Sequence, residues 1–276
     1  MDPLDKVGLE VRLLLEAIDS CYGYDFSHYA QGSLRRRILN RVSLSDLACV
    51  SAMIPKVLYE PAFFNLFLKD MSVTVTEMFR DIDVFKKIRH EVFTQLQTYS
   101  RVNIWHAGCA TGEEVYSMAI MLKEEGLLKR TRIYATDFNN YALDLAQKGI
   151  YSQDKLELFS NSYLGAGGKA SFFDYCHVNH GSAKMLESLK QNITFANHNL
   201  IKDQVFAEMH LIICRNVLIY FDQTLQNKVI KLFRDALVHK GFLVLGDKES
   251  LQFNSVGSEF DEYDKSCKIY RRGSYD

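Results

Sequence analysis

The chain has 276 residues, of which 47% are hydrophobic and 24% charged, a composition that suits one large globular domain or two unequal ones. Its formal net charge is −1, whereas nucleic-acid-binding proteins usually carry an excess of positive charge, so we expect no nucleic-acid partner. No apolar stretch approaches the roughly 20 residues that a membrane span needs, and the acidic N-terminus does not read as a signal peptide, so we expect a cytoplasmic monomer without membrane insertion.

The first eighty residues carry helical periodicity. Apolar residues recur at helical spacing over four segments, which are Leu9–Ile18, Leu34–Val42, Ser45–Val57 and Glu60–Leu68. A further helical pattern runs from Val84 to Tyr99 and leads into a buried strand. We therefore expect an N-terminal helical domain at residues 1–83 and a linker helix at 84–100.

From residue 101 onward the pattern changes to strands that alternate with helices. The predicted strands are Val102–Ala107, Thr131–Thr136, Asn192–Ala196, His210–Cys214, Gly241–Leu245 and Ser266–Tyr270. The predicted helices between them are Glu113–Glu125, Asn140–Lys148 and Gln223–Val238. The stretch Ser160–Gly168 holds three glycines and is predicted to be a loop, and Phe172–Leu189 suits short strands outside the main sheet. The alternation predicts an α/β domain at 101–276 with a mostly parallel sheet.

The run from Val102 to Glu114 joins a buried strand to an acidic helix start through Gly108 and Gly112. The two glycines let the backbone approach a ligand without a Cβ clash, and the helix N-terminus offers unpaired N–H groups. The spacing Gly-x-x-x-Gly-Glu differs from that of dinucleotide loops, and two glutamates would repel a pyrophosphate. The loop therefore predicts a cofactor with a single nucleoside, and the alternative is a tight strand–helix turn with acidic capping.

Two more polar groups follow predicted strands. Asp137 comes directly after the second strand, where an acidic residue commonly binds both hydroxyls of a ribose, and its alternative role is to cap the helix around Tyr141. Asn216 and Tyr220 follow the strand His210–Cys214, at the edge where cofactor and catalytic groups gather, although core aromatics at a strand–loop junction are the alternative.

Two arginine-containing segments precede the sheet. Just before the sheet lie Thr74, Thr76 and Arg80. The planar guanidinium of Arg80 suits a carboxylate. A surface ion pair with Asp81 or Asp83 is the interpretation that sequence alone favours. The helix around Ser33–Arg41 carries a basic cluster, which consists of Arg35, Arg36, Arg37 and Arg41. Such a cluster is usually a solvated face, but its density indicates an acidic partner.

Metal chemistry finds little support in the sequence. Cys176, His177 and His180 would form only half of a metal site, so we expect no bound metal. The six cysteines are scattered without a Cys-x-x-Cys pair, which favours free thiols in a reducing compartment.

Three segments together resemble the CheR family of S-adenosylmethionine-dependent chemoreceptor glutamate methyltransferases. Ala107–Ser117 is similar to the family's Ala-Gly-Cys-Ser-Thr-Gly-Glu-Glu-Pro-Tyr-Ser, and Thr74–Arg80 to its Thr-x-Phe-Phe-Arg. Cys214–Phe221 is similar to its Cys-Arg-Asn-Val-Leu/Met-Ile-Tyr-Phe, which is the most specific of the three. The similarity runs nearly from end to end of the chain.

The resemblance implies a Rossmann-like class I methyltransferase sheet whose last strand is antiparallel, an all-helical N-terminal domain and an inserted antiparallel β-subdomain at about 170–191. It implies S-adenosylmethionine as cofactor, S-adenosylhomocysteine as product and a chemoreceptor cytoplasmic domain as partner. The cofactor site would comprise Thr74, Thr76, Arg80, Gly108, Glu113, Asp137, Asn199, Leu200, Asn216 and Val217. Asp137 would hold the ribose, and Asn199 and Leu200 would flank the adenine.

The same resemblance implies that Arg80 and Tyr220 lie near the methyl group and the incoming carboxylate, as catalytic residues. The basic cluster Arg35, Arg36, Arg37 and Arg41 would face the acidic methylation region of the receptor. A glutamate carboxylate with a pKa of about 4.3 is already an ionised nucleophile at neutral pH, so the reaction needs no general base.

Several positions depart from the family pattern. They are Met78, His106, Ala110, Val115 and the segment Gly246–Ser250. None removes a matched cofactor contact, but the change at Asp247–Lys248 leaves the substrate open. Two other functions therefore remain: a catalytically weak signalling module that binds the cofactor or its product, and a methyltransferase of this family with another protein substrate. Retention of Arg80, Asn216 and Tyr220 favours catalysis.

Overall fold

The computed structural model describes residues 5–71, 76–179 and 181–273, which form two compact units. One unit comprises Met1–Val73 with Ile219–Gln226, and the other comprises Thr74–Leu218 with Asn227–Asp276. The expected domain boundary at residue 83 is therefore corrected, because Phe79 belongs to the second unit. Its fully buried ring lies 5.4 Å from that of Phe85 and 5.5 Å from that of Tyr163.

The first unit is helical in the residues described. Its elements are α1 (Lys6–Tyr22), α2 (Gln31–Leu44), η1 (Val50–Ala52), α3 (Met53–Tyr59) and α4 (Pro61–Met71). The side chain of Asp5 caps α1 by accepting from the Gly8 N–H at 2.9 Å. The helix expected at Ser45–Val57 begins only at Val50, because Asp46 adopts a left-handed φ of 50° that ends α2.

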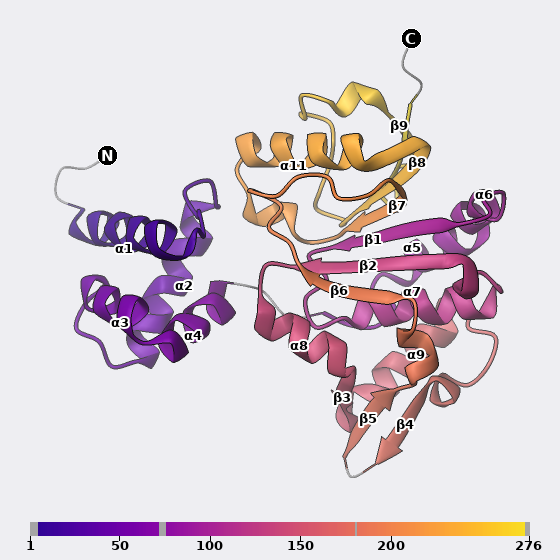
Figure 1. The fold of residues 1–276 in the computed structure, drawn as a ribbon, viewed down its shortest axis with the longest axis horizontal. Coiled ribbons are helices and arrows are strands. Elements are labelled where there is room, and N and C mark those ends of the chain that lie inside the picture. The colour runs from indigo at the N-terminus through magenta and orange to yellow at the C-terminus, as the bar shows by residue number, and fades with distance from the viewer. Residues whose placement is uncertain (1–4, 72–75, 180, 274–276) are drawn as a thin grey trace. The chain divides into compact units, whose positions relative to one another are not determined.

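The second unit is built on a seven-stranded sheet in the order β6-β2-β1-β7-β8-β10-β9 (Figure 1). Its strands are β1 (Val102–Ala107), β2 (Thr131–Asp137), β6 (Ile193–Asn197), β7 (Met209–Cys214), β8 (Leu237–Leu245), β9 (Phe260–Asp264) and β10 (Ile269–Arg272). The strands from β6 to β8 pair in parallel, while β10 is antiparallel to both of its neighbours. The predicted Rossmann-like sheet with an antiparallel last strand is confirmed, with β9 as a strand that the sequence did not indicate.

Helices cover both faces of this sheet. They include α5 (Ile82–Lys87), η2 (Ile88–Val92), α6 (Phe93–Leu96), α7 (Glu113–Glu124), α8 (Asn140–Lys148), α9 (Leu156–Gly165) and α11 (Gln223–Ala236). The short turns are η3 (Leu128–Arg130), η4 (Gln153–Lys155), η5 (Phe172–Tyr175), α10 (Glu187–Lys190), η6 (Leu218–Tyr220) and η7 (Gly257–Glu259). Ile104 of β1 lies in the core cluster with Met118 of α7, whereas the next side chain, Trp105, meets Phe233 of α11 at 5.3 Å. Successive strand residues face opposite sides, so the two helices lie on opposite faces.

A small antiparallel sheet projects from the second unit, in the order β3-β5-β4 (Figure 1). Its strands are β3 (Ile150–Ser152), β4 (Cys176–Asn179) and β5 (Ser182–Met185). This confirms the inserted β-subdomain and adds a strand upstream of the expected 170–191. The loop predicted at Ser160–Gly168 is wrong up to Gly165, because Phe159 and Tyr163 bury the same face of α9. No helix within the described ranges is long and apolar enough to cross a membrane.

Candidate cofactor site

The carboxyl ends of β1, β2 and β7 bring the predicted polar residues to one edge of the sheet. Ala107 of β1 pairs with Thr136 of β2, and His106 pairs with Ile213 of β7. Gly108, Asp137 and Asn216 therefore leave neighbouring strands at the same edge. Strand order reverses on either side of β1, and this switch point is where open α/β sheets bind ligands.

The glycine loop, which runs from Gly108 to Gly112, adopts a backbone conformation that requires glycine at both of these positions. Gly108 and Gly112 have φ values of 76° and 89°, and Ala110 between them has a φ of 47°. A Cβ on Gly108 would lie 2.5 Å from Cγ2 of Val217, and one on Gly112 would lie 2.9 Å from Cβ of Ala146. The loop after β1 thus packs closely against the turn after β7 and against α8, and only glycine fits at 108 and 112.

Asp137 is buried, with 8% of its surface exposed, and it fixes the loops around it. Its carboxylate accepts from the Ala110 N–H and the Asn139 N–H, each at 2.9 Å. Burial raises the pKa of Asp137, and these hydrogen bonds oppose the rise. The cap of α8 is Asn139, whose Oδ1 accepts from the Tyr141 N–H at 3.0 Å, so the reading of Asp137 as that cap is wrong.

The turn after β6 lies beside Asp137. The His198 N–H donates to the Asp137 carbonyl at 3.2 Å, which brings Asn199 and Leu200 next to this strand end. The Asn199 N–H donates to Asp203 at 2.7 Å, and Leu200 is 8% exposed. The residues predicted to flank a base thus follow directly on a residue that is hydrogen-bonded to the backbone of Asp137.

Glu113 begins α7 and is 2% exposed. Its carboxylate accepts from the Thr111 hydroxyl at 2.6 Å, and the Lys155 Nζ lies 3.8 Å from it. Burial raises the pKa of Glu113, while the Thr111 hydrogen bond and the Lys155 charge oppose the rise. The Tyr151 hydroxyl of β3 donates to the Thr111 carbonyl at 2.9 Å, so the small sheet also supports this loop. A buried carboxylate of this kind suits a cationic ligand.

Arg80 lies on a turn that its neighbours hold in place. Phe79 and Asp81 have φ values of 54° and 60°, and the Phe79 N–H donates to the Ser117 hydroxyl of α7 at 2.9 Å. Arg80 itself is exposed. Asp81 pairs with Arg215, which replaces the expected pairing of Arg80 with Asp81. Thr76 is half-buried at the start of this segment, and Thr74 lies outside the described residues.

Arg215 joins the Arg80 turn to α7, a contact that sequence reasoning missed. Its guanidinium donates to the Arg80 carbonyl and to Glu114 Oε2, each at 3.1 Å. Glu114 Oε1 also lies 3.1 Å from His106 Nδ1. Burial raises the pKa of Glu114, but the hydrogen bond with His106 and the charge of Arg215 outweigh this and lower it overall. The available signal was the position of Arg215 directly before Asn216 in the third matched motif.

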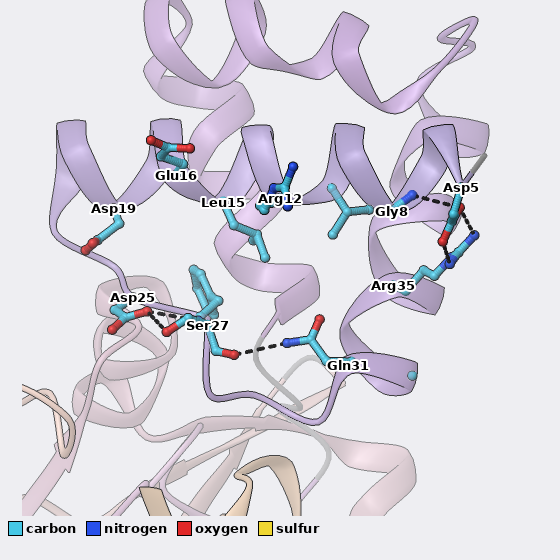
Figure 2. A pocket seen from close by; sticks show the side chains of 13 residues that line it. Asp5, Gly8, Arg12, Leu15, Glu16, Asp19, Asp25, Ser27, Gln31 and Arg35 are labelled. Atoms are coloured by element: carbon cyan, nitrogen blue, oxygen red, sulfur yellow. Dashed lines mark hydrogen bonds and ion pairs between the residues drawn. The ribbon is translucent and has the colours of Figure 1, made fainter. Parts of the chain in front are cut away.

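Tyr220 and the basic cluster belong to the helical unit. The Arg37 guanidinium lies 4.8 Å above the Tyr220 ring and donates to the Met71 carbonyl at 2.5 Å. Arg41 forms a two-bond ion pair with Asp70. Arg35 donates to Asp5 at 2.8 and 3.2 Å, at one end of a groove between α1 and α2 (Figure 2). Three of the four arginines thus have structural partners, whereas Arg36 is exposed.

The suggested metal half-site gains no further ligands from the structure. Cys176 is buried in β4, His177 next to it is exposed, and His180 lies outside the described residues. Throughout the described part of the chain, no group of three or more His, Cys, Asp or Glu residues could hold a metal ion.

Comparison with known proteins identifies both units. Residues 74–266 match the family model "CheR methyltransferase, SAM binding domain", and residues 9–72 match "CheR methyltransferase, all-alpha domain". A Pseudomonas putida protein named "Putative methyltransferase Cher3" is 47% identical over 97% of this chain and 98% of its own length. "Chemotaxis protein methyltransferase 2" of Pseudomonas aeruginosa is 30% identical over 78% of this chain and 76% of its own length. "Chemotaxis protein methyltransferase 1" of Vibrio cholerae is 32% identical over 66% of each chain.

Proposed function

The chain belongs to the CheR methyltransferase family, with S-adenosylmethionine as its cofactor, and from this premise we propose that it methylates glutamate side chains on a chemoreceptor's cytoplasmic domain. The product is a glutamate methyl ester, made in the cytoplasm during chemotaxis adaptation. The observation that supports this most is the placement of Arg80. Its guanidinium, which can hold a carboxylate, stands on a turn hydrogen-bonded to α7, the helix that begins at the glycine loop.

The described residues fit the chemical groups of the cofactor. The carboxylate of Asp137 suits the two ribose hydroxyls, and the buried carboxylate of Glu113 suits the ammonium of the methionine end. Burial raises the pKa of both Glu113 and Asp137, because an ionised carboxylate is costly away from water. Ligand groups that donate hydrogen bonds to these two carboxylates would offset that cost. Asn199 and Leu200 would flank the adenine. The proposed contacts are Thr74, Thr76, Arg80, Gly108, Glu113, Asp137, Asn199, Leu200, Asn216 and Val217.

Little further chemistry is required of the protein. Bound S-adenosylmethionine supplies an electrophilic methyl group on a sulfonium sulfur. The acceptor carboxylate is ionised at neutral pH, since its pKa is about 4.3, so no general base is needed. Transfer of that methyl group to a carboxylate oxygen would leave a neutral ester and S-adenosylhomocysteine. The role of Arg80 is to orient the acceptor carboxylate, because alignment of the reacting atoms lowers the barrier.

Two roles in the helical unit complete the proposal. Tyr220, four residues beyond Asn216 in the same motif, would lie near the methyl group and the acceptor. The basic cluster would face the acidic methylation region, with Arg36 as its main contact, because Arg35, Arg37 and Arg41 are engaged within the protein.

A transfer assay with radiolabelled S-adenosylmethionine and receptor cytoplasmic fragments tests the function. We expect base-labile label on the receptor, as a carboxyl methyl ester gives. Binding of the cofactor without transfer would instead favour the signalling module. Label that appears only on another protein would favour a different substrate.

Variants of Arg80 test the role of its guanidinium. We expect Arg80→Ala to lower the transfer rate by about 100-fold, because a misplaced acceptor loses its alignment. Affinity for S-adenosylhomocysteine should fall far less, because Arg80 is one of several proposed cofactor contacts and its main role is toward the acceptor. Arg80→Lys keeps the charge but not the planar fork and should recover only part of the rate. Arg132→Ala is a matched control, since this exposed arginine lies at the opposite end of β2. Near-normal transfer by Arg80→Ala would contradict the assignment.

A further inference from the structure

Glu249 is a buried carboxylate that joins two turns at the edge of the cofactor site. It is 4% exposed, and its oxygens accept from three backbone N–H groups. The donors are Asn216 at 3.0 Å, Leu218 at 2.7 Å and Gly246 at 2.6 Å. One side chain therefore connects the turn after β7 to the turn after β8. Hydrogen bonds to an ionised acceptor are roughly twice as strong as neutral ones.

The turn after β7 needs such support. Asn216 adopts a φ of 62°, in the left-handed region, which asparagine visits more readily than other residues with a Cβ but only as a single, locally supported residue. A conformation of this kind persists only where the surroundings hold it in place. The Glu249 carboxylate accepts from the N–H of Asn216, which precedes Val217, and from the N–H of Leu218, which follows it. The backbone on both sides of Val217 is thus fixed by one carboxylate.

The turn after β8 also determines where the Asn216 amide lies. A Cβ on Gly246 would be 2.8 Å from the Asn216 backbone nitrogen and 2.9 Å from its side-chain Nδ2. The Gly246 backbone therefore packs directly on Asn216. Gly246 is held there because its carbonyl accepts from the Glu249 N–H at 2.9 Å, while its own N–H donates to the Glu249 carboxylate. The residues between them, Asp247 and Lys248, are exposed and take no part in these contacts.

We propose that Glu249 is a positioning residue for the cofactor, acting through Asn216 and not by its own contact. It holds Asn216 in the left-handed conformation from which the amide meets the cofactor, and this rests on the Asn216 contact of the proposed function. The departure from the family pattern at Asp247–Lys248 leaves this arrangement intact, because neither side chain supports Asn216.

Calorimetric titration with S-adenosylhomocysteine tests the inference in a double-mutant cycle. We expect Glu249→Gln and Asn216→Ala each to raise the Kd about tenfold, since each loses charge-assisted or ligand hydrogen bonds. The double variant should lose less affinity than the product of the two single losses, because Glu249 acts mainly through Asn216 and otherwise only through the backbone beside Val217. Glu249→Gln combined with Asp137→Asn should show multiplied losses. Lys248→Ala, from the same turn, should bind like the wild type.

A purely structural role would give a different result. A variant that only folds poorly has a lower binding stoichiometry, whereas the Kd of its folded fraction does not change. Should Glu249→Gln not fold, Gly246→Ala perturbs the same arrangement without removing the carboxylate and should also raise the Kd, because its methyl group would lie 2.8 Å from both the Asn216 backbone nitrogen and Glu249 Oε2.

Two results would overturn the inference, and they are distinguishable. Wild-type affinity in Glu249→Gln, or losses that multiply with those of Asn216→Ala, would remove the role of Glu249 alone. Wild-type affinity in Asn216→Ala would remove the Asn216 contact of the proposed function and, with it, this inference.

Discussion

Replacing Arg215 with alanine tests whether one guanidinium holds the Arg80 turn to helix α7. The Arg215 side chain is 3% exposed and donates to Glu114 and to the Arg80 carbonyl, each at 3.1 Å. Removing it leaves the mostly buried Glu114 carboxylate with His106 as its remaining side-chain partner among the described residues. The pair with Asp81 adds little, because that side chain is 47% exposed.

The expected loss follows from these contacts. Breaking a buried ion pair costs about 3–5 kcal/mol, and the partial exposure of Glu114 places Arg215→Ala near the lower limit, at about 3 kcal/mol. For a unit of this size, the corresponding fall in Tm is roughly 6–12 °C. The exposed pair Lys86–Asp83, 3.8 Å apart, offers a control in the same unit. We expect Lys86→Ala to shift the Tm by no more than about 2 °C.

Thermal unfolding followed by circular dichroism measures both variants, and its pH dependence adds a second check. The pKa of Glu114 is lowered in the folded protein, so its ionised form contributes stability that is present above the ordinary value of 4.5 and lost as the pH falls through the folded pKa. The difference between the wild type and Arg215→Ala should therefore shrink in acid. The reasoning fails if the Tm of Arg215→Ala at neutral pH matches that of Lys86→Ala.

Two further predictions concern the ligands. The raised pKa of Glu113 means that affinity for S-adenosylhomocysteine should fall as the pH decreases toward the ordinary value of 4.5. Glu113→Gln should bind weakly and depend less on pH, with Asp137 as the remaining buried carboxylate, and an affinity of the wild type that stays flat down to that ordinary value would contradict this. Arg36→Ala should raise the KM for a receptor fragment without changing the Tm. Arg41→Ala should instead lower the stability by about 2 kcal/mol, because its hydrogen bonds to Asp70 are lost. The reverse pattern would argue against docking through Arg36.

Local patterns along the chain were sufficient to predict several elements of the fold. Val102–Ala107 and Asn140–Lys148 have the predicted bounds, because the apolar run of the strand and the caps Asn139 and Gly149 that flank the helix are local features. The alternation of strands and helices also brought Gly108, Asp137 and Asn216 to one edge, since the carboxyl ends of parallel strands meet there.

Short-range patterns could be misleading where burial decides the structure. The glycines near residue 165 predicted a loop, but α9 forms because the rings of Phe159 and Tyr163 are completely buried. The strand Ile150–Ser152 is too short to be recognised alone and exists through its pairing with Ser182–Met185. In both cases the stabilising partner lies outside the window that a sequence pattern covers.

Which polar groups meet depends on contacts between residues that are far apart in the chain. Arg215 reaches Asp81 across a separation of 134 residues, and Glu249 reaches Asn216 across 33. The same holds for Arg41, which the sequence placed on a docking surface and the fold pairs with Asp70. Side-chain type and spacing indicate what a residue can bind, whereas long-range packing determines which partner is within hydrogen-bonding distance. The two turns that hold Arg80 and Asn216 depend on that packing.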